Sequence, residues 1–109
     1  MLYDYIAQAD RVFPNTVDYE VKQKWLDTLE AKLKIELDGH IPEGTELVGV
    51  HPYDDIYIEY IKMKCAEMAG DITRFNNYLS LFNSARDELY AYYVRTYQTS
   101  KKARWKNVL

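Results

Sequence analysis

The sequence predicts an all-α fold: a small bundle of three main helices with a short N-terminal helix, a long loop and an extended basic C-terminal tail. Glycine and proline are sparse, at 4 and 3 of the 109 residues, which favours long helices over a turn-rich β fold. Apolar residues recur at steps of three and four, as on one face of an α-helix. Hydrophobic residues make up 48% of the chain, which disfavours intrinsic disorder and provides one buried core.

The first predicted helix covers residues 2–12. It ends before Pro14, because proline disfavours the α conformation at the residue that precedes it. Its inward positions are expected to be Tyr5, Ile6, Ala9 and either Val12 or Phe13.

The second predicted helix covers residues 17–37. Asn15 or Thr16 can cap its free backbone N–H groups, and Gly39 supplies the left-handed conformation in which helices commonly end. Its inward stripe consists of large apolar side chains: Val21, Trp25, Leu26, Leu29, Leu33 and Leu37.

Residues 38–52, "DGHIPEGTELVGVHP", form a long connection that holds three of the four glycines and two of the three prolines. One short extended piece is expected at "ELVGV". Loops of this length inside a compact domain are usually functional or mobile, and in an oligomer such a loop is a natural arm.

A third helix is predicted to begin with Pro52 near its first turn and to end at about Ala69. Its apolar side chains cover more than half of its circumference, which places it at the centre of the bundle. They are Ile56, Tyr57, Tyr60, Ile61, Met63, Cys65 and Met68. Gly70 breaks this helix, and Asp71 caps a fourth helix that extends to about Gln98.

The fourth helix is expected to have two faces of different character. One is aromatic and apolar, with Phe75, Tyr78, Leu79, Phe82, Leu89, Tyr93 and Tyr97. The other carries small, mostly neutral side chains: Asn76, Asn77, Ser80, Asn83, Ser84 and Ala91. A solvent-exposed face normally carries Lys and Glu, often in i,i+4 pairs. Arg86 falls within the aromatic face, where it must extend to the rim, stack on a ring or pair with a carboxylate of a neighbouring helix or subunit.

Residues suited to catalysis or metal binding are few, so the sequence predicts a protein that is not an enzyme and has no cofactor. His40 and His51 lie in the loop without a Cys/His cluster, and Cys65 lies among apolar residues with no base beside it. Asp55 and Glu59 form an i,i+4 carboxylate pair, for which neutralisation by a nearby lysine is favoured over a metal site.

Charge is distributed unevenly, since residues 101–109 hold four of the fourteen Lys and Arg and none of the seventeen Asp and Glu. The first hundred residues therefore carry a balance of −7 and the last nine a balance of +4. The basic tail, residues 99–109, suits docking on an acidic protein surface or on nucleic acid. Its binding side chains would be Lys101, Lys102, Arg104, Trp105 and Lys106.

Three further features of the sequence bear on where the protein occurs and what it contacts. The lone cysteine cannot form an internal disulfide, which indicates a reducing intracellular compartment. No apolar run approaches ~20 residues and "MLYDYIAQADRVF" lacks a basic and an apolar region, so neither a membrane span nor a signal peptide is expected. Tyrosine occurs 11 times, and its amphipathic ring suits either the rim of a core or an interface.

Residues 51–98 resemble the small head–tail connector, or adaptor, proteins from the head-morphogenesis genes of tailed phages and prophages. The similarity lies in "PYDDIYIEY" (52–60), "AGDITRFNN" (69–77) and "FNSA" (82–85), followed by an aromatic run that ends in "RTY". The N-terminal half is similar only loosely, through "LYDYIAQADRVFPN" and the "WL" of the second helix. These motifs are structural and include no catalytic signature.

The resemblance implies a helical domain, residues 1–98, that joins a ring, commonly of twelve subunits, beneath the portal vertex of the capsid. Such a ring extends the DNA channel without sequence-specific DNA binding and connects the portal protein to the next neck or tail-completion protein. The protein would occur in the host cytoplasm during assembly and in the virion neck afterwards. The basic tail would reach the portal, and the 38–52 loop would serve a neighbour or the channel.

Within such a ring, one surface of the fourth helix is predicted to contact the adjacent subunit. Its residues are Asn76, Asn77, Ser80, Asn83, Ser84 and Arg86. The alternative to a subunit contact is that this surface is an exposed polar face with few charges.

A second function class also stays open, a small binding or regulatory protein whose basic tail contacts nucleic acid or an acidic partner. A steep salt dependence of DNA binding, lost on deleting residues 100–109, would favour that class.

Overall fold

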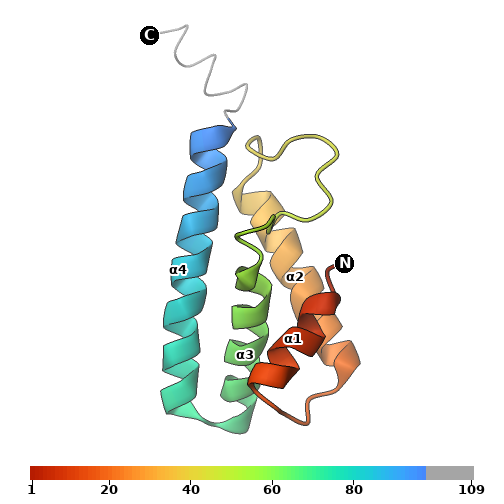
Figure 1. The fold of residues 1–109 in the computed structure, drawn as a ribbon, viewed down its shortest axis with the longest axis vertical. Helices are drawn as coiled ribbons and strands as arrows, with labels where there is room; N and C mark the ends of the chain where they lie inside the picture. The colour runs from red at the N-terminus through yellow and green to blue at the C-terminus, as the bar shows by residue number, and fades with distance from the viewer. Residues whose placement is uncertain (98–109) are drawn as a thin grey trace, which may run out of the picture.

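Four α-helices form the regular structure of residues 1–97, the part of the chain that the structure, a computed structural model, describes (Figure 1). They are α1 (Asp4–Val12), α2 (Tyr19–Glu36), α3 (Asp55–Ala69) and α4 (Ile72–Thr96). No strand occurs among these residues, so the predicted all-α fold is confirmed. The predicted basic tail, residues 99–109, lies outside the described residues.

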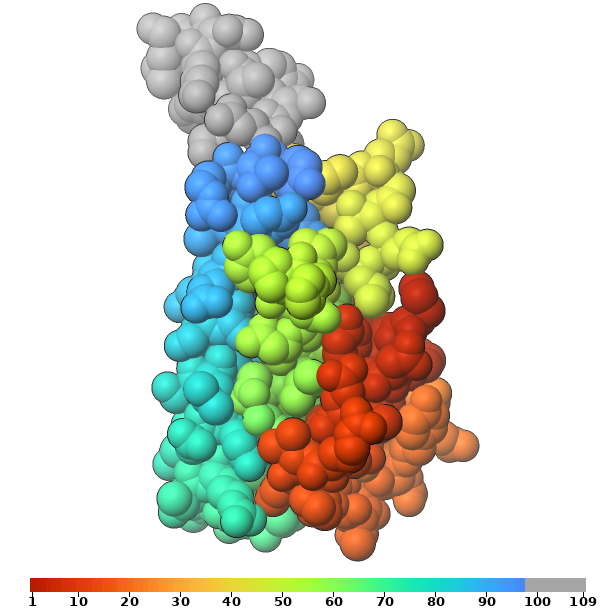
Figure 2. Space-filling view, in the orientation of Figure 1, coloured from red at the N-terminus to blue at the C-terminus, as the bar shows by residue number. Residues whose placement is uncertain are grey.

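α3 lies at the centre of the bundle, as its apolar circumference predicts. α4 packs along one side of it and α1 and α2 cover the other, so α2 and α4 are separated by α3 along most of their length (Figure 1). The loop between α2 and α3 covers the end of the bundle at which α4 ends (Figure 2). The side chains buried between the helices and under this loop include Ile6, Leu26, Leu29, Leu33, Val48, Ile56, Tyr57, Ile61, Phe82, Leu89 and Tyr93.

Local signals set most helix ends where the sequence predicts them. The Asp71 carboxylate accepts a hydrogen bond from the Arg74 backbone N–H at 3.1 Å and caps α4. Gly70 ends α3 in the left-handed region at φ 72°, and Gly39 follows α2 with φ 85°. These are positions at which a Cβ atom would be strained.

The start of α2 differs from the prediction. Asn15 does not cap the helix, which begins at Tyr19. Its side chain instead accepts from the Val17 N–H at 3.1 Å and donates to the Asp10 carboxylate at 3.0 Å. Asn15 thus stabilises the turn between α1 and α2, because short polar side chains readily bond nearby backbone groups.

Two residues expected to face inward are exposed. Val12 and Met68 are 61% and 62% exposed, since each lies in the last turn of its helix, where no neighbouring element covers it. Phe13, the alternative to Val12, is half-buried, with its ring centroid 5.6 Å from that of Tyr78. The "ELVGV" segment also forms no strand, because side chains of α2 and α3 rather than a second strand bind its N–H groups.

Candidate interaction surfaces

α4 exposes a row of small neutral side chains over most of its length. These are Asn76, Asn77, Ser80, Ser84 and Ala91. Leu81 and Val94 beside them are 45% and 41% exposed, although large apolar side chains are usually covered. We call these seven residues the outer face of α4. Its opposite side supplies Phe82, Leu89 and Tyr93 to the core, so the predicted division of the helix into two faces is confirmed.

The predicted subunit-contact residues do not all lie together. Asn83 is half-buried at the edge of the outer face. Arg86 lies two residues after Ser84, about 200° round the helix, and so on the other side of α4. Its side chain is 39% exposed and its Nε lies 3.9 Å from the Asp87 carboxylate. Within residues 1–97 no carboxylate of another helix pairs with Arg86, which extends to the rim of the core instead.

A hollow with acidic walls lies between α3 and α4, next to the outer face of α4. It has a volume of about 180 Å³ and is lined by Asp55, Glu59, Leu81, Ser84, Ala85 and Glu88. The Lys62 ammonium lies 2.7 Å from Glu59 Oε1 and 4.7 Å from the centre of the Tyr78 ring. The predicted neutralisation of Glu59 by a lysine is therefore confirmed. Glu59 Oε2 is buried without a hydrogen-bond partner among the described residues.

A buried polar network attaches the long loop to three helices. The Glu30 carboxylate of α2 accepts from the Val48 N–H at 2.9 Å and from the Tyr57 hydroxyl at 2.6 Å. The Tyr57 hydroxyl of α3 accepts from the Gly49 N–H at 2.7 Å, and the Tyr93 hydroxyl of α4 donates to the Val48 carbonyl at 2.5 Å. Burial, and secondly the hydrogen bond to Glu30, raises the pKa of Tyr57, so this hydroxyl stays protonated.

A second buried charge joins α1 to α2. Lys22 is only 3% exposed, and its ammonium donates to the Asp10 carboxylate at 2.8 Å and 3.0 Å. Neither Lys22 nor Glu30 was singled out from the sequence. A signal existed, because Lys22 falls within the angular sector of α2 that Leu26, Leu29 and Leu33 occupy and Glu30 lies about 40° from its edge. A charged residue at a core angle indicates a buried ion pair or polar network.

The C-terminal end of α4 lies against the loop. His40 Nδ1 lies 2.8 Å from the Tyr97 carbonyl oxygen, and the rings of Tyr92, Tyr93 and Tyr97 pack together with centroids 5.3 Å to 6.0 Å apart. His51, by contrast, is 87% exposed. The loop therefore contacts Tyr97, the last residue that the structure describes. The predicted tail contacts, Lys101 to Lys106, lie outside the described residues.

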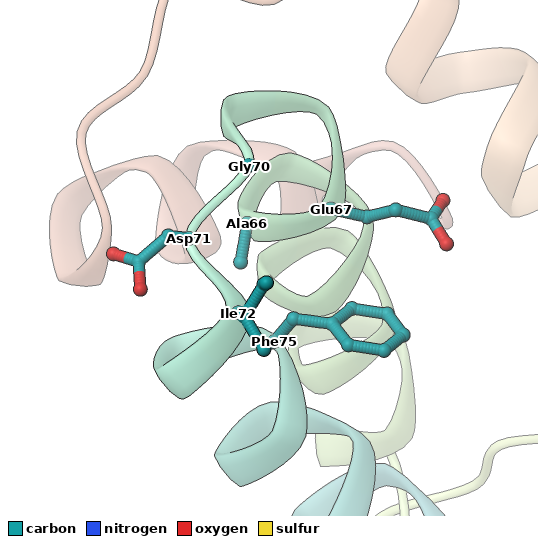
Figure 3. A pocket seen from close by; sticks show the side chains of 6 residues that line it. All are labelled: Ala66, Glu67, Gly70, Asp71, Ile72 and Phe75. Atoms are coloured by element: carbon teal, nitrogen blue, oxygen red, sulfur yellow. The ribbon is translucent and has the colours of Figure 1, made fainter.

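A smaller hollow of about 110 Å³ lies at the turn between α3 and α4. Figure 3 shows the carboxylates of Glu67 and Asp71 pointing away to either side, so that Ala66, Ile72 and Phe75 present hydrocarbon to it. Close by in α3, burial raises the pKa of the Cys65 thiol to about 11. At neutral pH this thiol is protonated, the opposite of what a nucleophile requires.

The chain matches no protein-family model, no curated protein and no solved structure. Within residues 1–97, His, Cys, Asp and Glu side chains form no group of three or more that could hold a metal ion. None of the four described helices is long and apolar enough to cross a membrane. Three parts of the described surface have a character suited to contact with a partner: the outer face of α4, the acidic hollow and the end of the bundle where α4 meets the loop.

Proposed function

We propose that this chain is a structural subunit of a phage or prophage head–tail connector ring. The ring docks beneath the portal protein, extends the DNA channel and joins the capsid to a neck or tail-completion protein. The chain contributes three long helices and a short first helix to the ring, with the basic segment 99–109 directed to the portal. Assembly takes place in the host cytoplasm, and the mature ring belongs to the virion neck.

The outer face of α4 is the observation that supports this proposal most. A helix turned to water is normally covered by Lys and Glu, whereas the exposed positions of α4 from Asn76 to Ser84 are all neutral and include Leu81. Exposed charges follow further along, at Asp87, Glu88 and Arg95. Interfaces are depleted of charge at their centre, and small side chains allow helices to approach closely. The resemblance of residues 51–98 to connector proteins gives the kind of assembly in which such a face would be used.

The charge balance supports the same role. Residues 1–100 carry a balance of −7, which repels the phosphate backbone of DNA, so that DNA would pass such a ring without being held. The last nine residues carry +4 and suit an acidic protein surface. A protonated, buried Cys65 also favours a structural role over catalysis.

Two lysines on the outer face of α4 would test the proposal. We expect Ser80→Lys with Ser84→Lys to abolish ring assembly, because both positions would place a charge within the subunit contact. The matched control is Ala7→Lys with Gln8→Lys on the exposed side of α1. Sedimentation of the full chain, alone and with portal rings, measures assembly, and circular dichroism verifies the fold. Unchanged assembly of the α4 variant would contradict the proposed interface.

A small binding or regulatory protein is the second candidate, and the +4 charge of residues 101–109 favours it. It predicts DNA binding that weakens steeply with salt and disappears when residues 100–109 are deleted. The connector predicts no such binding. Sequencing the DNA on either side of the gene separates the two further, because genes for a portal, a major capsid protein and small neck proteins would support the connector alone.

A further inference from the structure

The side of α2 that faces away from the bundle carries unpaired positive charge beside an exposed apolar residue. Its central positions follow one another at steps of three and four and are all exposed: Lys24, Thr28, Ala31 and Ile35. Lys32 and Lys34 flank them and are also exposed. Ile35 is 74% exposed. None of the three lysines has an ion-pair partner among residues 1–97. We call these six residues the outer face of α2.

The α4 side of the molecule has the complementary character. Asp55, Glu59 and Glu88 line the acidic hollow, where Lys62 neutralises only Glu59. Glu59 is half-buried with its Oε2 out of contact with solvent, whereas Asp55 and Glu88 are exposed and can be reached by a donor from outside the chain. Leu81, at 45% exposure, lines the same hollow. The hollow thus holds more carboxylates than cations, and the outward side of α2 holds three lysines against the two exposed carboxylates of Glu20 and Asp27.

The two outer faces lie on different sides of the subunit. α2 and α4 flank α3, and each turns its buried stripe towards the bundle, so their outer faces point away from it on separate sides (Figure 1). Two different patches of this kind can pair only head to tail, with the first face of one copy against the second face of the next. Contacts of that type generate rings when the rotation between copies closes.

We propose that the outer face of α2 in one copy docks on the outer face of α4 in the next, with Lys24 and Lys32 entering or lining the acidic hollow. The inference rests on the proposed ring and names its contact. An ammonium group has three donors and no acceptor, which suits the exposed carboxylates of Asp55 and Glu88. Ile35 and Leu81 supply apolar contact, and the small side chains of α4 permit close approach. The charges set the register between copies.

Charge reversal on each face provides the test. The first variant carries Lys24→Glu with Lys32→Glu, and the second carries Asp55→Lys with Glu88→Lys. We expect each alone to raise the protein concentration needed for assembly about 100-fold, because like charges would meet across every contact. An equal mixture of the two restores assembly, since each altered α2 face meets an altered α4 face and each native face meets a native one. Rings formed in this way contain the variants in alternation.

The controls separate failure of this contact from failure of the ring itself. Circular dichroism first establishes that both variants are folded, and Glu43→Lys with Glu46→Lys, at exposed positions of the α2–α3 loop outside the contact, is expected to assemble normally. If the native chain forms no ring alone or on the portal, both the ring and the contact are wrong. If it forms rings that the charge reversals leave intact, or if the mixture does not assemble, only the contact is wrong. If deleting residues 98–109 abolishes assembly while the Lys24 and Lys32 variant still assembles, the tail of a neighbour occupies the hollow instead, and the inference is overturned.

Discussion

The hydroxyl of Tyr57 and the carboxylate of Glu30 form a buried hydrogen bond of 2.6 Å that joins α3 to α2. The same carboxylate holds the Val48 N–H, and the same hydroxyl accepts from the Gly49 N–H. Three hydrogen bonds, between residues 8, 18 and 27 positions apart, thereby satisfy these four polar groups. The Val48–Gly49 part of the long loop is consequently fixed on α2 and α3.

Tyr57→Phe removes the hydroxyl and leaves the Glu30 carboxylate and the Gly49 N–H with one partner fewer in a buried site. We expect the free energy of unfolding to fall by about 2 kcal/mol, measured by urea denaturation. Tyr60→Phe is the matched control, because Tyr60 packs on Phe82 and its hydroxyl forms no hydrogen bond with residues 1–97. Equal losses in the two variants would show that the network adds nothing to stability.

Gly49→Ala is expected to displace the loop. A Cβ atom at this position would lie 2.5 Å to 2.9 Å from two ring carbons and the hydroxyl oxygen of Tyr57, whose side chain is completely buried. Overpacking of this kind typically costs about 1–3 kcal/mol. Urea denaturation measures the loss, with Glu46→Ala in the same loop as an exposed control. A stability unchanged from that of the native chain would mean that the loop is not clamped on Tyr57.

Lys22→Met keeps the hydrocarbon stem of the side chain and removes the ammonium that binds Asp10. Because Asp10 stays partly exposed and keeps its bond from Asn15, we expect a modest loss of about 1–2 kcal/mol. Lys24→Met, two residues further along and on the exposed side of α2, should change stability by less than about 0.5 kcal/mol. The prediction fails if chemical denaturation gives the two variants the same stability.

Alkaline pH should destabilise the protein over a defined range. Burial, together with the hydrogen bond to Asp54, raises the pKa of Tyr5 to about 12, and burial near Tyr92 raises the pKa of Tyr93 to about 12, from an ordinary 10. Both phenols must therefore lose their protons more readily in the unfolded chain. The stability that they contribute is fully present below pH 10 and is lost as the pH rises from about 10 to about 12.

The urea concentration at the midpoint of unfolding, measured across that pH range, tests this prediction. Tyrosinate absorbance provides a second signal. Tyr93→Phe removes one of the titrating groups and should make the fall in midpoint shallower. A midpoint that stays constant from pH 10 to pH 12 would rule out the raised pKa values.

Local chemistry makes much of the fold predictable. The Asp71 cap, the glycine ends at Gly39 and Gly70, and the central position of α3 all follow from short-range propensity and the period of apolar residues. The loop was less predictable, because the partners of its N–H groups come from α2 and α3, 18 and 8 residues away in the sequence. A pattern of period 3.6 contains no information about such pairings.

The outer face of α4 was predictable from helical spacing, whereas the acidic hollow beside it was not. Helical spacing alone places Asn77, Ser80 and Ser84 on one exposed face of α4. It cannot show that Glu88 of α4 and Asp55 of α3 line one hollow, since that depends on how two helices are juxtaposed. Arg86 stands apart from the face because its angle, rather than its nearness in sequence to Ser84, determines which side it occupies.

Electron microscopy of the full chain mixed with portal rings encoded beside its gene tests the central claim most directly. The proposed function predicts an additional closed ring of this chain on each portal, with a continuous axial channel, and loss of that layer in the Ser80→Lys and Ser84→Lys variant. Bare portal rings in the presence of a large excess of folded, monomeric chain would contradict it.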